Sequence, residues 1–189
     1  VTMSIGGDRW DATLPYLFGS PANRLTVFFG RSFIHIIDGF LGVVISFIWG
    51  ILLLGLRFSP ACVPGLALAV LAVVFATSGL GLLMGCVALI TRNIMFVNNT
   101  VFFLLLLLSG ANIPLETMPA WMRAVSTSVP LTHGIAAARE TIAAGGLTEH
   151  AGRLLLTETG IGAAYLLAGY LLFRVFERRA KVTGSLETM

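Results

Sequence analysis

Few polar residues in this sequence have the spacing of a catalytic motif. The three histidines are His35, His133 and His150. None of them belongs to an HExxH zinc pair, and no GxSxG occurs. The one lysine, Lys181, is followed by valine, which excludes a G-x-x-x-x-G-K-[ST] phosphate loop. Acid–base chemistry by Glu158, Asp38 or Glu140 with a histidine stays open, although no pair has a diagnostic spacing. We therefore predict no catalytic residue and no enzyme activity.

The cysteines and the charges predict neither a metal site nor a nucleic-acid site. Cys62 and Cys86 would lie roughly 36 Å apart on one continuous helix, which is beyond disulfide reach, and they have no CxxC spacing. The net charge is +3, and lysine and arginine form no cluster before the last span. We expect no metal, no cofactor and no nucleic-acid partner for this chain.

The composition is that of a protein that lies in a bilayer. Hydrophobic residues make up 57% and charged residues 11% of the sequence, and the mean hydropathy is +0.92. Ordinary globular chains contain about 25% charged residues. Apolar stretches of about 17 to 25 residues can cross the hydrocarbon core. The pattern predicts an all-α polytopic bundle with four transmembrane helices, at residues 33–56, 63–90, 94–111 and 154–176.

Several polar side chains fall inside these predicted spans. Arg31, His35 and Asp38 share one helical stripe. Asp38 is either neutralised by its neighbours near the inner interface, or it lies on a transport path or at a subunit contact. The polar residues that we single out within the membrane are His35, Asp38, Asn98, Asn99 and Glu158.

The second predicted span is rich in alanine and glycine. Ala72 and Ala76, and then Gly81 and Gly85, form small-xxx-small pairs that allow another helix to approach closely. Such pairs are common in a glycine-rich helix. They predict packing without identifying the partner helix.

Residues 113–147 interrupt the apolar pattern. Met118, Trp121, Met122 and Val125 have the spacing of an amphipathic helix. A second short helix follows Pro130 and is closed by glycines 145 and 146. We expect Thr117 and Thr148 to cap the helices that follow them. Because no run here reaches about 18 apolar residues, two short external re-entrant helices fit better than a span.

The segment 8–24 precedes the first predicted span. Trp10, Leu14, Leu17 and Phe18 recur at helical spacing, with aspartates on other faces. The segment is either a helix on the membrane surface or a docking helix for a cytosolic partner.

The basic residues predict the orientation of the chain. If the N-terminal region is cytosolic, that side holds Arg9, Arg24, Arg31, Arg92, Arg174, Arg178, Arg179 and Lys181. The other side then holds Arg57, Arg123, Arg139 and Arg153. Four spans leave both termini in the cytosol and place residues 113–153 outside.

The stretch from Leu108 to Glu140 closely resembles the signature region of ABC-2 type exporter permeases. That pattern combines Ser-Gly, a proline, a Met-Pro step with an aromatic residue, and Pro-Leu-Thr followed by an arginine. The matching positions are Ser109, Gly110, Pro114, Met118, Pro119, Trp121, Pro130, Leu131, Thr132 and Arg139.

The segment 8–24 resembles the cytosolic coupling segment of the same family. Thr13, Leu14, Ser20 and Pro21 match, whereas Ala12 and Pro15 stand where glycine and glutamate are usual. The resemblance implies that residues 1–189 belong to one transmembrane domain of six spans. The first two spans would be missing here, in a fragment or in a distinct short form.

The resemblance also implies a mechanism. The chain would be a non-catalytic permease that pairs with a second copy or a paralogue, in a bacterial cytoplasmic membrane. A separate ABC ATPase subunit would bind ATP and Mg²⁺. Its motion would reach the spans through a coupling helix that contains Trp10, Thr13, Leu14, Leu17 and Phe18. The external gate would contain Gly110, Pro114, Pro119, Trp121, Pro130 and Arg139, and the path between the permeases would be lined partly by Asn98 and Asn99.

The cargo is the least constrained part of this prediction. The composition and the PLTHGI element are similar to drug-exporter permeases of the daunorubicin-resistance type, which implies a hydrophobic drug, an antibiotic or a lipid-like substrate. Export of polysaccharide or lipid-linked glycan is an alternative within the same family. A membrane enzyme that acts on a lipid-linked substrate, or a channel or scaffold subunit, would be an alternative of another class.

Overall fold

The computed structural model describes residues 24–55, 59–91 and 93–183. These ranges form helices and contain no strand, which confirms the predicted all-α bundle. The helices are α3 (Arg24–Leu54), α4 (Cys62–Ile90), α5 (Ile94–Leu108), the short 3₁₀ helix η1 (Leu115–Thr117), α6 (Ala120–Ser126), α7 (Thr132–Ala144) and α8 (Glu149–Thr183).

Two of the described helices are long and apolar enough to cross a membrane. Their apolar segments are Cys62–Val87 in α4 and Glu149–Val175 in α8. Two shorter apolar segments, Ile37–Leu53 in α3 and Ile94–Leu108 in α5, accompany them. The helix α3 begins nine residues before the predicted start of the first span, and α5 ends three residues before the predicted end of the third.

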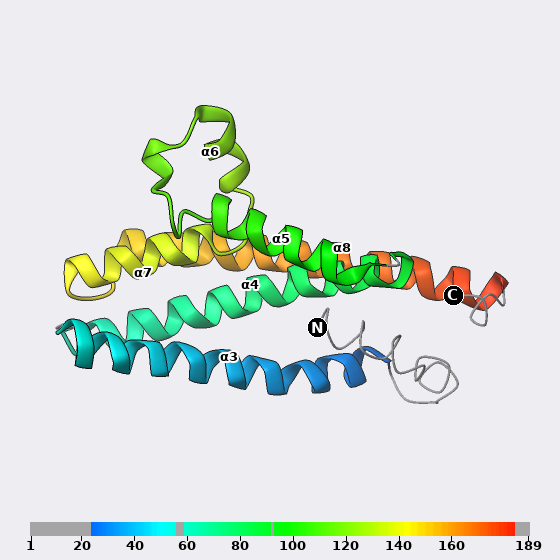
Figure 1. Ribbon diagram of the computed structural model, residues 1–189, viewed down its shortest axis with the longest axis horizontal. Coiled ribbons are helices and arrows are strands. Elements are labelled where there is room, and N and C mark those ends of the chain that lie inside the picture. The colour runs from blue at the N-terminus through cyan, green and yellow to red at the C-terminus, as the bar shows by residue number, and fades with distance from the viewer. Residues whose placement is uncertain (1–23, 56–58, 92, 184–189) are drawn as a thin grey trace.

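The helices α4 and α8 form the centre of the bundle and run in the same direction (Figure 1). The Cys62 thiol at the start of α4 contacts the end of α7, 3.4 Å from the carbonyl of Thr141. Near the other end of α4, the Cys86 thiol lies 3.6 Å from the carbonyl of Gly169 in α8. The helix α7 runs antiparallel to both and packs against each of them.

Small residues allow α4 and α8 to approach closely. A Cβ atom built on Gly162 would lie 2.7 Å from the Cα of Ala76, and one on Gly79 would lie 2.7 Å from the carbonyl oxygen of Gly162. Ala72 and Ala76 are buried in this contact. The first small-xxx-small pair therefore faces a helix of the same chain, α8.

The core is small and the outer surface is strongly apolar. The buried cluster consists of Ala69, Ala72, Ala137, Ala151 and Leu155. Large apolar side chains instead point outward, above all along α3 and α5, as in Phe33, Ile34, Leu52, Leu53, Phe96 and Phe103. Exposure of such a surface to water would be unfavourable, whereas lipid or other membrane helices would cover it. This distribution is that of a helical membrane bundle.

The chain leaves the bundle between α5 and α7. Residues 109–131, which include η1 and α6, project away from the plane of the long helices (Figure 1). The chain then returns into α7, turns at Gly145 in the left-handed conformation (φ 75°) and continues into α8. Thr148 caps α8 as predicted, since its hydroxyl accepts a hydrogen bond of 3.0 Å from the N–H of Ala151.

The predicted cap at Thr117 is wrong. Thr117 ends η1, and its hydroxyl donates to the carbonyl of Pro114 at 2.8 Å. The helix α6 begins at Ala120 with Pro119 as its N-cap residue. Proline has no N–H and a fixed φ, which suits the boundary of a helix.

Candidate functional site

The carboxylate of Glu158 holds the beginning of α7. Its Oε1 accepts a hydrogen bond of 2.7 Å from the N–H of Leu131. Its Oε2 accepts two more, each of 3.1 Å, from the N–H groups of His133 and Gly134. The first turn of a helix has N–H groups without intrahelical partners, and a negative charge there is favoured by the helix dipole. Because α7 has no side-chain cap of its own, Glu158 of α8 takes that role.

Glu158 is fully buried, with 0% of its surface exposed. It lies roughly 13 Å along the axis from Glu149, where the apolar segment of α8 begins. A hydrocarbon core is about 30 Å thick. The carboxylate is therefore far from either end of the apolar segment, where an unpaired charge would be very unfavourable. Its three N–H donors explain how the chain accommodates it there.

The chain enters α7 in a strained conformation. Leu131 has φ 91° and ψ −31°, and it is the one non-glycine residue with positive φ in the described ranges. A side chain in this region costs about 1 to 3 kcal/mol and persists where the surroundings impose it. The buried ring of Pro130 on one side and the Glu158 carboxylate on the other impose it here.

Gly134 lets the first turn of α7 lie directly against α4. A Cβ atom at this position would stand 2.2 Å from Cγ2 of Val73 and 3.7 Å from the carboxyl carbon of Glu158. Val73 lies roughly 16 Å along α4 from Cys62, again well inside the apolar segment. The start of α7 is thus clamped between two long helices at an intermediate level of both.

Two further contacts tie the preceding turn to the bundle. Nε2 of His133 lies 3.0 Å from the carbonyl of Thr127, and because a carbonyl only accepts, this nitrogen must carry the hydrogen. The hydroxyl of Tyr165 in α8 donates to the carbonyl of Ser128 at 3.3 Å. Within the part of the chain that the structure describes, the buried hydroxyl of Thr132 has no hydrogen-bond partner.

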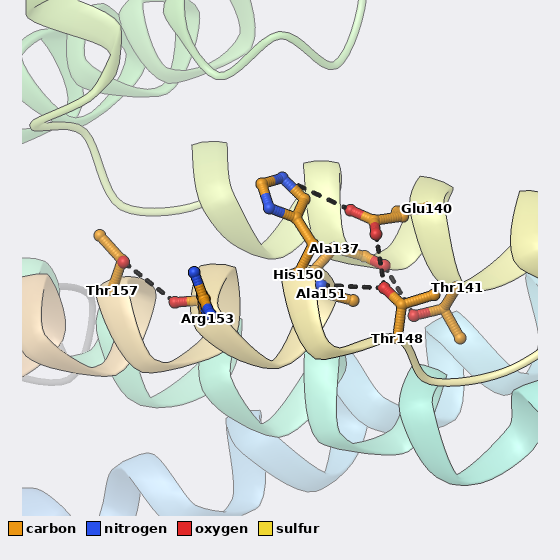
Figure 2. A network of polar contacts seen from close by, with 8 residues as sticks. All are labelled: Ala137, Glu140, Thr141, Thr148, His150, Ala151, Arg153 and Thr157. Atoms are coloured by element: carbon orange, nitrogen blue, oxygen red, sulfur yellow. Dashed lines mark hydrogen bonds and ion pairs between the residues drawn. The ribbon is translucent and has the colours of Figure 1, made fainter.

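A second polar network joins the other end of α7 to the start of α8 (Figure 2). The hydroxyl of Thr148 donates to Oε1 of Glu140, and Nε2 of His150 lies 3.7 Å from Oε2 of the same carboxylate. Both α7 and α8 therefore carry a carboxylate that bonds to the other helix. Glu140 lies near the turn between the two helices, whereas Glu158 contacts the other end of α7, at its first turn.

The arginines beside this region bond to main-chain carbonyls. Arg139 donates to the carbonyl of Ala111 at 2.9 Å. Arg123 donates to the carbonyls of Glu116 and Met118 at 3.2 and 3.3 Å. These two side chains therefore stabilise the projecting segment 109–131.

The structure brings together some of the residues that the sequence singles out. Glu158 bonds to the N–H of Leu131, directly after the buried Pro130, at the start of α7. Gly110 (φ 75°) turns the chain after α5. Pro114, Pro119 and Trp121 lie on the projecting segment, and Trp121 is 69% exposed.

The remaining predicted residues lie elsewhere. Asp38 is exposed on α3, which also carries His35. On α5, Asn98 is half-buried and Asn99 is exposed. The predicted coupling residues, Trp10, Thr13, Leu14, Leu17 and Phe18, lie outside the described residues.

Among the residues that the structure covers, no three histidine, cysteine or acidic side chains lie close enough together to hold a metal ion. The residues that sequence reasoning missed are Gly134, Val73 and the backbone of His133. One signal for them was available, because a carboxylate in an apolar span requires donors. The sequence does not identify which donors these are.

Comparison with known proteins identifies the family. The family model described as ABC-2 type transporter matches residues 8–143, from the N-terminal segment into α7. The chain is 28% identical over 145 residues to the inner membrane transport permease YhhJ of Escherichia coli K12 and, to the same extent, of Shigella flexneri. These alignments cover 77% of this chain but 35% of each relative. No solved structure matches. The chain belongs to the ABC-2 type transporter family, whose members are membrane permeases.

Proposed function

We propose that this chain is the permease part of an ATP-driven exporter, which moves a hydrophobic drug, an antibiotic or a lipid-like molecule outward across the cytoplasmic membrane. The match of the ABC-2 family model to residues 8–143 carries this proposal. The chain spans about a third of the length of the YhhJ relatives that it matches.

The projecting segment supports a path beside α5 and α7. Residues 109–119 are mostly non-helical, and Thr117, Arg123 and Ser128 are exposed. Irregular backbone at membrane depth is tolerated where protein buries it or where it borders water. In the proposed exporter this segment and the Asn99 side of α5 border the path between two permease subunits, and the cargo passes along it.

The proposed partners follow from the same assignment. A separate ABC ATPase subunit binds ATP and Mg²⁺ and docks on residues 8–24, and a second permease copy or a paralogue completes the path. ATP binding alternates the access of the path by favouring one conformation over the other. In this assignment both termini lie in the cytosol and the turn between α7 and α8 lies outside.

The docking role is tested by Leu14→Asp and Leu17→Asp in the complete permease, purified with its ATPase. A charge in an apolar docking surface is expected to reduce cargo-stimulated ATP hydrolysis and transport roughly tenfold or more. Leu147→Asp is the matched control, because Leu147 is an exposed leucine between α7 and α8, outside the proposed docking segment 8–24. It is expected to leave both rates unchanged.

The outcomes separate the proposal from its alternatives. Unchanged coupling in the Leu14 and Leu17 variants contradicts docking on this segment. Turnover of a lipid-linked substrate by the permease without any ATPase contradicts an exporter altogether. In proteoliposomes, ATP-dependent movement of a hydrophobic dye supports the proposed cargo, whereas movement of a lipid-linked glycan alone supports the glycan alternative.

A further inference from the structure

We infer that Glu158 is a positioning residue that fixes the first turn of α7 to α8. As a result, α4, α7 and α8 move as one rigid unit while the permease changes conformation. The inference deepens the proposed function, and only its nucleotide-dependent part rests on that function.

The first reason is the chemistry of the contact. Glu158 is fully buried, and its two oxygens accept hydrogen bonds from three N–H groups at the start of α7, those of Leu131, His133 and Gly134. A carboxylate that faced a path would keep an oxygen free for water or cargo. This carboxylate is turned toward the main chain of its own subunit.

The second reason is that α7 is fastened to α8 at both of its ends. The Glu158 carboxylate holds the first turn, and the Glu140–Thr148 hydrogen bond holds the last turn. Two separated fixed points prevent a helix from pivoting about either one. Contact with α4 at Val73 and at Cys62 completes the unit.

The third reason is the contrast with the neighbouring elements. The helices α4, α7 and α8 pack extensively against one another, whereas α5 and α6 contact the rest of the described chain sparsely. The strained backbone at Leu131 lies where these two parts join. Relative motion is therefore expected in the 109–131 segment and at α5, before the Glu158 contact, and not within α7.

Amide hydrogen exchange tests the contact directly, in the complete permease with its ATPase in lipid nanodiscs. In the parent protein, the amides of Leu131, His133 and Gly134 are expected to be protected. Glu158→Ala removes both acceptor oxygens, and with them all three hydrogen bonds, and is expected to speed exchange at these positions by roughly tenfold or more, the factor for losing a hydrogen bond to a charged group. The interior of α7 keeps its protection.

Glu158→Gln keeps the test valid if the alanine variant does not fold. Glutamine has almost the same shape but only one acceptor oxygen, so part of the set is expected to exchange about tenfold faster. The matched control is Glu149→Gln, which replaces an exposed carboxylate on the same helix that pairs with Arg153. It is expected to leave the three amides unchanged.

Two results with these variants would overturn the positioning role. One is unchanged exchange at the three amides in both Glu158 variants. The other is loss of protection throughout α4, α7 and α8, which would mean that Glu158 supports the fold in general.

A non-hydrolysable ATP analogue with Mg²⁺ tests the rigid unit. The three amides are expected to stay protected while exchange changes in α5 or in residues 109–131. Nucleotide-induced exposure of the three amides would overturn the rigid unit. If nucleotide changes exchange nowhere in the permease, the proposed function fails, and the Glu158 variants still decide the positioning role.

Discussion

At the scale of single residues, the main feature is a carboxylate that bonds only to backbone N–H groups. Removing a partner from a buried hydrogen bond typically costs about 1 to 3 kcal/mol, so the contact between Glu158 and α7 is a substantial part of the local stability. Its geometry depends on Gly134, because any side chain there would meet Val73 of α4.

Gly134→Ala is expected to destabilise the protein by about 1 to 3 kcal/mol, because the new methyl group overlaps Cγ2 of Val73. Val73→Ala removes that atom and is expected to restore most of the loss when the two changes are combined. The free energy of unfolding in mixed detergent measures both effects.

Gly152→Ala is the control for this cycle. Gly152 also lies in the first turns of a helix, but its added Cβ meets no atom within 4 Å. The change is expected to be neutral or to stabilise by up to about 1 kcal/mol through helix propensity. If Gly134→Ala is equally harmless, or if Val73→Ala does not rescue it, the close contact between α7 and α4 is not present in the membrane.

The sequence indicates which residues matter here better than it indicates what they touch. A glutamate inside a predicted span is visible at once, and Pro130 visibly ends a helical pattern. The contact between Leu131 and Glu158 could not be predicted, because the two residues are far apart along the chain and the Glu158 carboxylate accepts from main-chain groups. Every residue except proline offers the same N–H, so no side-chain pattern marks the donors.

At the scale of elements, the contact between α4 and α8 determines the shape of the bundle. Its two faces are lined by alanine and glycine, which brings the helix backbones close together without a large buried side-chain volume. Most large apolar residues lie on the outer surface, whereas Leu82 and Phe173 are buried. The stability of this helix pair therefore depends on the absence of larger side chains at its closest contacts, such as Gly79 and Gly162.

Gly162→Ala is expected to weaken this pair, since the added Cβ would lie 2.7 Å from the Cα of Ala76, a backbone atom that cannot move aside alone. A loss of about 1 to 3 kcal/mol is expected. Gly160→Ala, two positions away on α8, meets nothing within 4 Å and is expected to be neutral. Thermal denaturation of the two variants side by side checks this, and equal midpoints would contradict the observed helix pairing.

The elements themselves were largely predictable, because hydrophobic runs and glycine boundaries are local properties. The prediction of a short helix closed by glycines 145 and 146 corresponds to α7 and its left-handed end at Gly145. The sequence did not predict that α7 starts deep between α4 and α8. An amphipathic pattern shows that a helix has one apolar face, but it does not distinguish a lipid headgroup layer from another helix as the neighbour.

At the scale of the whole molecule, the two ends of the bundle are distinct. The turn between α3 and α4 and the turn between α7 and α8 lie at one end, where Gly146 approaches Ala61 (Figure 1). The start of α3 and the end of α8 lie at the other end. If the long helices cross the membrane, each pair of ends shares a side.

Labelling from outside the cell checks this arrangement. Ser59→Cys and Leu147→Cys place exposed thiols at the two turns, in a background where the buried Cys62 and Cys86 are replaced by alanine. Both are expected to react with a membrane-impermeant maleimide on intact cells, because the basic residues predict that this end is external. Labelling of one thiol alone would contradict the placement of both turns on one side of the membrane. Labelling of neither thiol until the cells are opened would show that this end is cytosolic.

The use of backbone N–H groups at the start of α7 has a consequence for how such a protein can diversify. The side chains of Leu131 and His133 can be exchanged without removing the hydrogen bonds to Glu158, since those bonds come from the main chain. Positions 134 and 158 have no such freedom. Natural variants are therefore expected to differ in the side chains at positions 131 and 133 while they keep glycine at 134 and glutamate at 158.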